Sequence, residues 1–193
     1  MENLINEISG YIGIFQVLIG GILGFLGGIV STWFLQRRQM KIDRENLSST
    51  LAGEIGAIIS IIETRGFERE IRDTLKRIRD GELIKFTRPI RRNYTQVYEH
   101  NVVKLGILDK TLAMQIVTFY TQINALLEDN QEMGEIDVTT CDLKYLVDRH
   151  EEMLELLTNN VELGKEIKKK LDIPASRKDE IDSNITDKRL PPT

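Results

Sequence analysis

The hydrophobic pattern of this chain changes sharply after Leu35. From Tyr11 to Leu35 the sequence is YIGIFQVLIGGILGFLGGIVSTWFL, which has no charged residue and only Gln16 as a strongly polar side chain. A helix of this length measures about 37 Å, which exceeds the roughly 30 Å hydrocarbon core of a bilayer. Glycines weaken helices in water, but a single segment in lipid satisfies its backbone hydrogen bonds only as a helix. We therefore predict a transmembrane helix at residues 11–35.

Small residues recur every four positions along this predicted span. Residues four apart lie on one face of a helix, and a face without bulky side chains lets a second helix approach closely in lipid. Other glycines repeat every seven positions, so the handedness of the helix crossing stays open. We predict that the span self-associates into a homo-oligomer through a glycine zipper. The predicted transmembrane packing face consists of Gly20, Gly24, Gly28 and Thr32.

The charges on either side of the span indicate its orientation. Residues 1–10 contain no Lys or Arg, whereas Arg37, Arg38, Lys41 and Arg44 follow the span. Because basic flanks stay on the cytoplasmic side, we predict a short extracytoplasmic N-terminus and a cytoplasmic remainder. A cleaved secretory signal is the competing interpretation, but its basic region should precede the apolar stretch. The expected location is the bacterial inner (plasma) membrane, crossed once.

A helical pattern continues beyond the span. Apolar residues at spacings of three and four mark one stripe of a helix; they are Leu47, Leu51, Ile55, Ile58 and Ile62. We expect a helical stalk at 36–64, a cytoplasmic helical domain at 65–173 and a disordered tail at 174–193, where large apolar residues become scarce. The predicted fold class is all-α, with one N-terminal transmembrane helix that continues into the stalk and a cytoplasmic antiparallel helical bundle.

Glycines divide the first part of the predicted cytoplasmic domain. Gly66 breaks the pattern of the stalk, and a short amphipathic helix follows it. Gly81 is the candidate C-cap of this helix. A further helix is expected from about Asn93 to Lys104.

Capping residues mark the two longest helices of the domain. Asp109 is a candidate N-cap, and the helix after it should end in a polar loop around Gly134. Thr139 and Asp142 resemble a capping box that begins the last helix, which Pro174 ends.

Histidine and cysteine are too scarce for the common catalytic and metal sites. Cys141 is the only cysteine, so it cannot form an intrachain disulfide, and we expect it to fill a small space in the core. The only histidines are His100 and His150, and no second histidine follows His150 at the spacing of a zinc-binding HExxH helix. We expect both at the surface or boundary of the domain. A glycine-rich phosphate loop is also missing from the sequence, so we expect no enzyme activity, no cofactor and no metal.

Basic residues concentrate between Arg65 and Arg92, although the formal net charge of the chain is −4. Such a cluster could attract an anionic ligand, or it could be a solvated helix face with ion pairs inside the bundle. A nucleic acid partner is not expected. The candidate anionic-ligand patch consists of Arg69, Arg72, Lys76, Arg79, Arg88, Arg91 and Arg92. The acidic run Asp148, Glu151, Glu152 and Glu155 is either a solvated face or a partner for these basic residues.

Residues 100–129 read HNVVKLGILDKTLAMQIVTFYTQINALLED, in which an Asn and a Leu-Gly turn precede a helix ending in Phe-Tyr. This segment resembles a helix-turn-helix hairpin of small bacterial membrane-anchored proteins of unassigned function. The resemblance implies a bacterial setting and a helical fold, and it implies no activity. The matching positions are Asn101, Leu105, Gly106, Phe119 and Tyr120.

These patterns lead to two functional hypotheses. The first is a non-enzymatic, membrane-anchored interaction or signalling protein that self-associates through its span and receives a cytoplasmic protein or an anionic ligand. The alternative is an oligomeric membrane effector or pore, gated by the cytoplasmic domain, as in bacterial antiphage defence. Gln16, Ser31 and Thr32 of the span give little polar lining, which counts against a wide channel.

Overall fold

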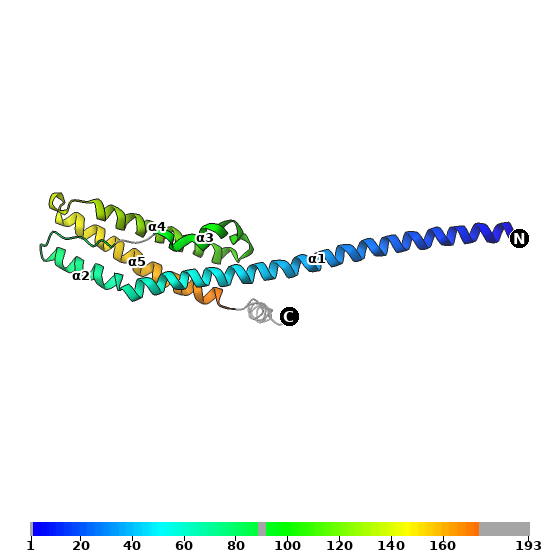
Figure 1. Ribbon diagram of the computed structural model, residues 1–193, viewed down its shortest axis with the longest axis horizontal. Helices are drawn as coiled ribbons and strands as arrows, with labels where there is room; N and C mark the ends of the chain where they lie inside the picture. Colours follow the sequence, from blue (N-terminus) through cyan, green and yellow to red (C-terminus); the bar gives the residue numbers. More distant parts are fainter. Residues whose placement is uncertain (1, 89–91, 174–193) are drawn as a thin grey trace, which may run out of the picture. The chain divides into compact units, whose positions relative to one another are not determined.

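A computed structural model describes residues 2–88 and 92–173, and within these residues the chain is helical without a strand (Figure 1). This confirms the predicted all-α class. The α-helices are α1 (Glu2–Arg65), α2 (Phe67–Arg79), α3 (Gln96–Asn101), α4 (Lys110–Glu135) and α5 (Leu143–Leu171). Three short 3-10 helices join them: η1 (Arg92–Thr95), η2 (Val102–Ile107) and η3 (Val138–Thr140). The predicted tail at 174–193 lies outside the described residues.

The chain divides into two compact units, residues 1–43 and residues 44–193. We call the described part of the second one the helical unit. It includes the last turns of α1, where Leu51 and Ile55 are 0% exposed and share a core with Phe119 of α4. The stripe that predicted a stalk helix is therefore, from Leu47 onward, a core surface of the helical unit.

Two glycines with left-handed backbone set the ends of α2. Gly66 has φ of +66°, a conformation that costs a side-chain-bearing residue energy, and it separates α1 from Phe67, the first residue of α2. At the other end Gly81 has φ of +96°. Its N–H donates to the carbonyl of Ile78 at 2.9 Å, while the N–H of Glu82 donates to Arg77 at 3.0 Å. This pair of bonds is a Schellman motif, so both glycine predictions are confirmed.

Aspartates begin the two longest helices of the helical unit. The carboxylate of Asp109 accepts the N–H groups of Thr111 and Leu112 at 3.0 and 3.2 Å, which confirms the predicted N-cap of α4. Asp142 caps α5 by accepting the N–H of Lys144 at 3.2 Å. The predicted capping box is wrong, because Thr139 belongs to η3 and Asp142 is itself the N-cap.

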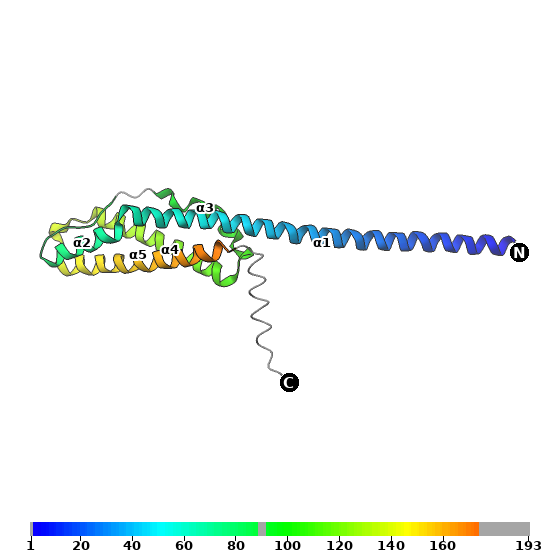
Figure 2. The ribbon, with the colours of Figure 1, turned by 90° about the horizontal axis from the view of Figure 1, so that it is seen from below.

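The helices α4 and α5 pack side by side and run in opposite directions (Figures 1 and 2). Asn160 of α5 bonds the carbonyl of Phe119 at 3.0 Å, and Arg149, earlier in α5, reaches Asp129, later in α4, at 2.7 Å. On its other side α5 packs against α2. The core accordingly has two clusters, one around Phe119 between α1, α4 and α5, and one around Met153 between α2, α4 and α5.

The helix predicted at 93–104 is replaced by a broken one. Only the six residues of α3 are α-helical, and 3-10 turns precede and follow them. The β-branched pair Val102 and Val103 and the nearby Gly106 disfavour a continued α-helix, while Leu105 is buried and holds η2 against the core. The prediction of a polar loop around Gly134 is also wrong, because α4 continues through Gly134 to Glu135.

Close packing at Gly164 of α5 leads to a stability prediction. A Cβ atom placed there would lie 2.5 Å from Cε2 of Phe119 and 2.9 Å from Cδ1 of Ile59. We expect Gly164→Ala to lower the free energy of unfolding by about 1 to 3 kcal/mol through overpacking. Gly53→Ala is the matched control, because that exposed helical position has no atom within 4 Å of the added carbon, and it should gain about 0.5 to 1 kcal/mol. Thermal unfolding of both variants in detergent checks this contrast, and equal midpoints would contradict it.

Candidate functional site

The apolar stretch of α1 is exposed on all sides. Every side chain described between residues 24 and 43 is solvent-exposed, including Phe25 at 70% and Phe34 at 64%. Among the described residues, α1 is the one helix long and apolar enough to cross a membrane, and it lies near the N-terminus. So much exposed apolar surface in one place marks a membrane or protein contact.

The predicted packing face is open wherever it is described. A Cβ atom at Gly24 or Gly28 would meet nothing within 4 Å. The hydroxyl of Thr32 donates to the carbonyl of Gly28 at 2.8 Å, so this face carries no free polar donor at Thr32. The surroundings of Gly20 lie outside the described side chains.

A cation–π contact marks the end of the apolar stretch. The guanidinium carbon of Arg37 lies 3.7 Å from the ring centroid of Trp33. Trp and Arg are common where a membrane helix leaves the hydrocarbon core, since each has an apolar body and a polar end. The basic flank that predicted orientation thus starts with a side chain folded back onto the aromatic ring.

Three of the five residues of the predicted basic patch whose side chains are described form ion pairs within the helical unit. Arg72 binds Glu68 at 2.7 Å. Arg79 pairs with Glu151 of the acidic run on α5, and Arg88 pairs with Glu70. These contacts agree with the second interpretation of the basic cluster, in which its residues form ion pairs with other helices or within their own helix. Arg69 and Lys76 have no ion pair among the described residues, and the side chains of Arg91 and Arg92 lie outside them.

A carboxylate of α1 holds α3 in place. Glu54 accepts the backbone N–H groups of Val97 and Tyr98 at 2.7 and 3.0 Å, and it also accepts the hydroxyl of Tyr120 at 2.6 Å. The rings of Tyr98 and Tyr120 stack with centroids 4.0 Å apart. Burial, followed by the hydrogen bond to Glu54, raises the pKa of Tyr120. Glu54 thus serves as a cap for α3 that is supplied by another helix.

Residues 82–88 have no regular structure, and buried side chains bond their backbone. The N–H of Phe86 donates to Nε2 of His150 at 2.9 Å. Asn130 accepts the N–H of Arg88 at 3.2 Å and donates to its carbonyl at 2.8 Å. Lys85 in turn donates to the carbonyls of Gly134 and Ile136 at the end of α4. Because buried backbone groups must be paired, these side chains fix the path of the segment.

His150 lies in the interior, and the expectation that it would be a surface or boundary residue is wrong. It is 0% exposed, and its Nδ1 lies 2.6 Å from the carbonyl of Leu146. Nδ1–H donates to that carbonyl while Nε2 accepts from Phe86, so the geometry requires the neutral ring with its proton on Nδ1. Burial lowers the pKa of His150. His100, by contrast, is exposed as expected.

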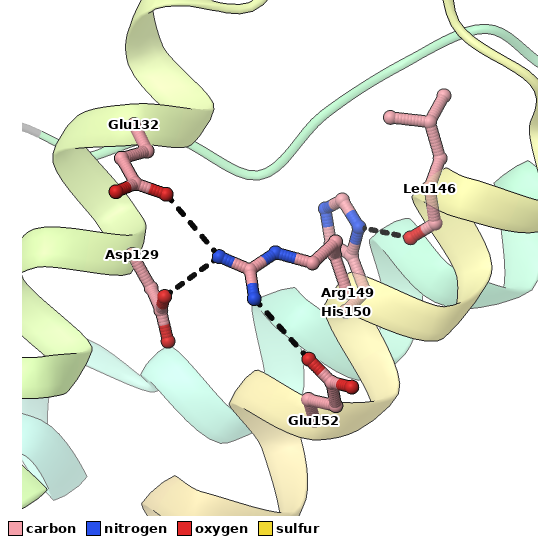
Figure 3. A network of polar contacts seen from close by, with 6 residues as sticks. All are labelled: Asp129, Glu132, Leu146, Arg149, His150 and Glu152. Carbon is pink, nitrogen blue, oxygen red and sulfur yellow. Dashed lines mark hydrogen bonds and ion pairs between the residues drawn. The ribbon is translucent and has the colours of Figure 1, made fainter.

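An arginine beside His150 joins α4 and α5 (Figure 3). The guanidinium of Arg149 lies between Asp129 of α4 at 2.7 Å, Glu132 of α4 at 3.3 Å and Glu152 of α5 at 3.2 Å. Figure 3 shows it extending toward α4, while the ring of His150 is directed toward the carbonyl of Leu146. Neighbouring residues of one helix thus make an outer ionic contact and an inner neutral one.

The described residues contain no candidate metal site. No group of three or more His, Cys, Asp or Glu residues among them could hold a metal ion. Cys141 is partly buried against the core, with Sγ 3.4 Å from the carbonyl of Asp137. Glu54, Asn130 and His150 all serve to hold backbone in place. Comparisons with protein families, curated proteins and solved structures give no match for this chain.

The buried histidine makes stability depend on pH. A histidine whose pKa is lower in the folded chain binds more protons when unfolded, so its stabilising effect is complete above the unfolded value of about 6.5 and is lost as pH falls toward the lower folded value. We expect the unfolding free energy to fall by up to about 1.4 kcal/mol per pH unit in that window. Denaturant titrations between pH 7.5 and 5.5 measure it. His100→Gln should keep this slope and His150→Gln should abolish it; the same slope in both variants would contradict the assignment.

Proposed function

We propose that this protein is a non-enzymatic, membrane-anchored interaction or signalling protein. In this proposal residues 11–35 of α1 cross a bacterial inner (plasma) membrane once, and residues 36–173 lie in the cytoplasm as a stalk and an antiparallel helical bundle. The observation that carries the proposal is the apolar stretch of α1, whose described side chains are exposed from residue 24 to residue 35. Removing such surface from water is worth about 25 cal/mol per Å², which is a strong reason for a lipid environment.

Self-association of the span is supported by its open small-residue face. Gly24 and Gly28 leave room for a neighbouring backbone, and close backbone approach is what drives helix association in lipid, where apolar burial gives no advantage. The hydroxyl of Thr32 is already bonded within its own helix, so it need not find a partner in the interface. A homo-oligomer places copies of the helical unit near each other, ready to receive a cytoplasmic protein or an anionic ligand.

The pore alternative has weaker support from the same residues. A water-filled channel needs polar groups along its wall. Of the polar residues in the predicted span, Thr32 uses its hydroxyl on the carbonyl of Gly28. The buried polar side chains of the helical unit also serve structural bonds, such as those of Glu54 to α3. An interaction role therefore fits these contacts better than a gated channel does.

The proposed orientation can be tested with reporter fusions. A reporter enzyme that is active only outside the cytoplasm should work when it is fused before Tyr11 and should be inactive when it is fused after residue 173. The reason is the basic flank after Leu35. A complementary reporter that is active only in the cytoplasm is the control and should give the opposite pattern. Activity on the wrong sides would reverse the orientation and remove the cytoplasmic assignment.

Self-association can be tested with a pair of matched substitutions. Gly24→Ile puts a branched side chain into the open face and should abolish the oligomer. Leu26→Ile introduces the same branched residue about 200° around the helix, at a position that already carries an exposed side chain, and should keep the oligomer. Native mass measurement in detergent and crosslinking in membranes measure subunit number. Full assembly of the Gly24 variant would leave the span as an anchor only.

A further inference from the structure

The turn η2 exposes apolar side chains next to a buried anchor. Val103 is 87% exposed, and Val102 and Ile107 are exposed beside it. Leu105, in the middle of the same turn, is 6% exposed and packs into the core with α1 and α4. The turn is therefore held firmly from the inside while it presents a small apolar tip to the outside.

This tip lies at the end of the helical unit where the chain enters it. Leu108, directly after η2, lines a surface cleft together with Arg44 and Glu45, the first residues of the unit, and with Leu171 at the end of α5. Only nine steps of chain separate Leu35 from Arg44, and even a fully extended chain of that length reaches no more than about 32 Å. Arg44 therefore lies at most about 32 Å from Leu35, the last residue of the apolar stretch.

The charges around the tip match a lipid surface. Lys104 lies within η2 and Lys110 begins α4, and both are exposed. Asp109, directly before Lys110, is also exposed, but its carboxylate is used to cap α4. Exposed valines beside lysines are suited to an interface where apolar groups enter the headgroup layer and ammonium groups meet anionic phosphates. A second protein copy is a poorer occupant, because a stable interface buries about 800 Å² on each partner, far more than three side chains on one turn offer.

We infer that η2 is a second membrane contact, in which Val102 and Val103 enter the headgroup region of the cytoplasmic leaflet and Lys104 binds anionic lipid. This inference rests on the proposed membrane anchor and adds to it. The contact would give the helical unit a second point of attachment to the bilayer, in addition to the anchor.

An environment-sensitive label on the full chain tests this contact. In a Cys141→Ser background, Val103→Cys is labelled with a nitrobenzoxadiazole dye and the protein is reconstituted into vesicles of phosphatidylcholine with phosphatidylglycerol. Leu83→Cys is the matched control, because Leu83 is also an exposed apolar side chain but is near Lys85, which bonds the far end of α4. We expect blue-shifted emission and quenching by nitroxide lipids at position 103 and neither at position 83. Lys104→Glu, or vesicles of phosphatidylcholine alone, should weaken the signal at position 103.

The outcomes separate this inference from the proposed function. If the labelled protein floats with vesicles but position 103 is no better quenched than position 83, the η2 contact is overturned and the anchor stands. If the protein does not float with vesicles, the anchor itself is overturned. Emission at position 103 that follows the protein-to-lipid ratio and ignores lipid charge would assign the tip to contact between copies and would also overturn the inference.

Discussion

The approach of α5 to both α1 and α4 at Gly164 is the constraint on which the helical unit depends. The ring of Phe119 and the side chain of Ile59 occupy the space that any larger residue would need. Phe119 in turn meets the ring of Tyr120 edge to face, with centroids 5.2 Å apart. Tyr120 bonds Glu54, and Glu54 holds the first N–H groups of α3. Because Gly164 has no side chain, Phe119 can pack against α5, and the contacts continue through Tyr120 and Glu54 to α3, which lies directly before η2.

The unit uses buried polar groups where its chain is least regular. Broken helices leave backbone groups without partners, and burial of such groups is costly unless they are bonded. Glu54 meets this need for α3, while His150 and Asn130 meet it for residues 82–88. These buried hydrogen bonds also make the sites sensitive to substitution, because removing one partner leaves the other group buried and unpaired. We therefore expect the function of this unit to involve its exterior, where side chains are not needed to hydrogen-bond buried backbone groups.

The regular helices could be predicted from the sequence because their signals are local. The apolar stripes, Gly66, Gly81 and the cap Asp109 depend on near neighbours in the chain, and each has the predicted role. Asp142 is the exception, because it is itself the N-cap of α5 and not the partner of a Thr139 cap. The roles of buried polar residues depend on distant partners and were not predicted. One signal was available for His150: it lies four residues after Leu146 and seven before Leu157, on the apolar stripe of α5.

The candidate membrane contacts also divide into features set by nearby residues and features set by residues that are distant in sequence. Spacing alone placed Gly24 and Gly28 on one side of a helix, because every residue involved belongs to that helix. The apolar tip of η2 could not be found in this way, since VVKLGI has the composition of a core segment. Which of its residues are exposed follows only from the burial of Leu105 against helices that are distant in sequence.

The bonds to residues 82–88 also bear on how this sequence can vary. The path of that segment depends on its own Lys85 and Phe86 and also on positions 130 and 150, which lie in other helices. Substitutions at exposed positions such as Leu83 should be tolerated, since the donors and acceptors that set the path belong to the backbone. A change at Asn130 or His150 alters a segment more than forty residues away. The conformation of residues 82–88 thus depends on side chains in α4 and α5. A substitution at position 130 or 150 therefore requires a compensating change if the segment is to keep its path.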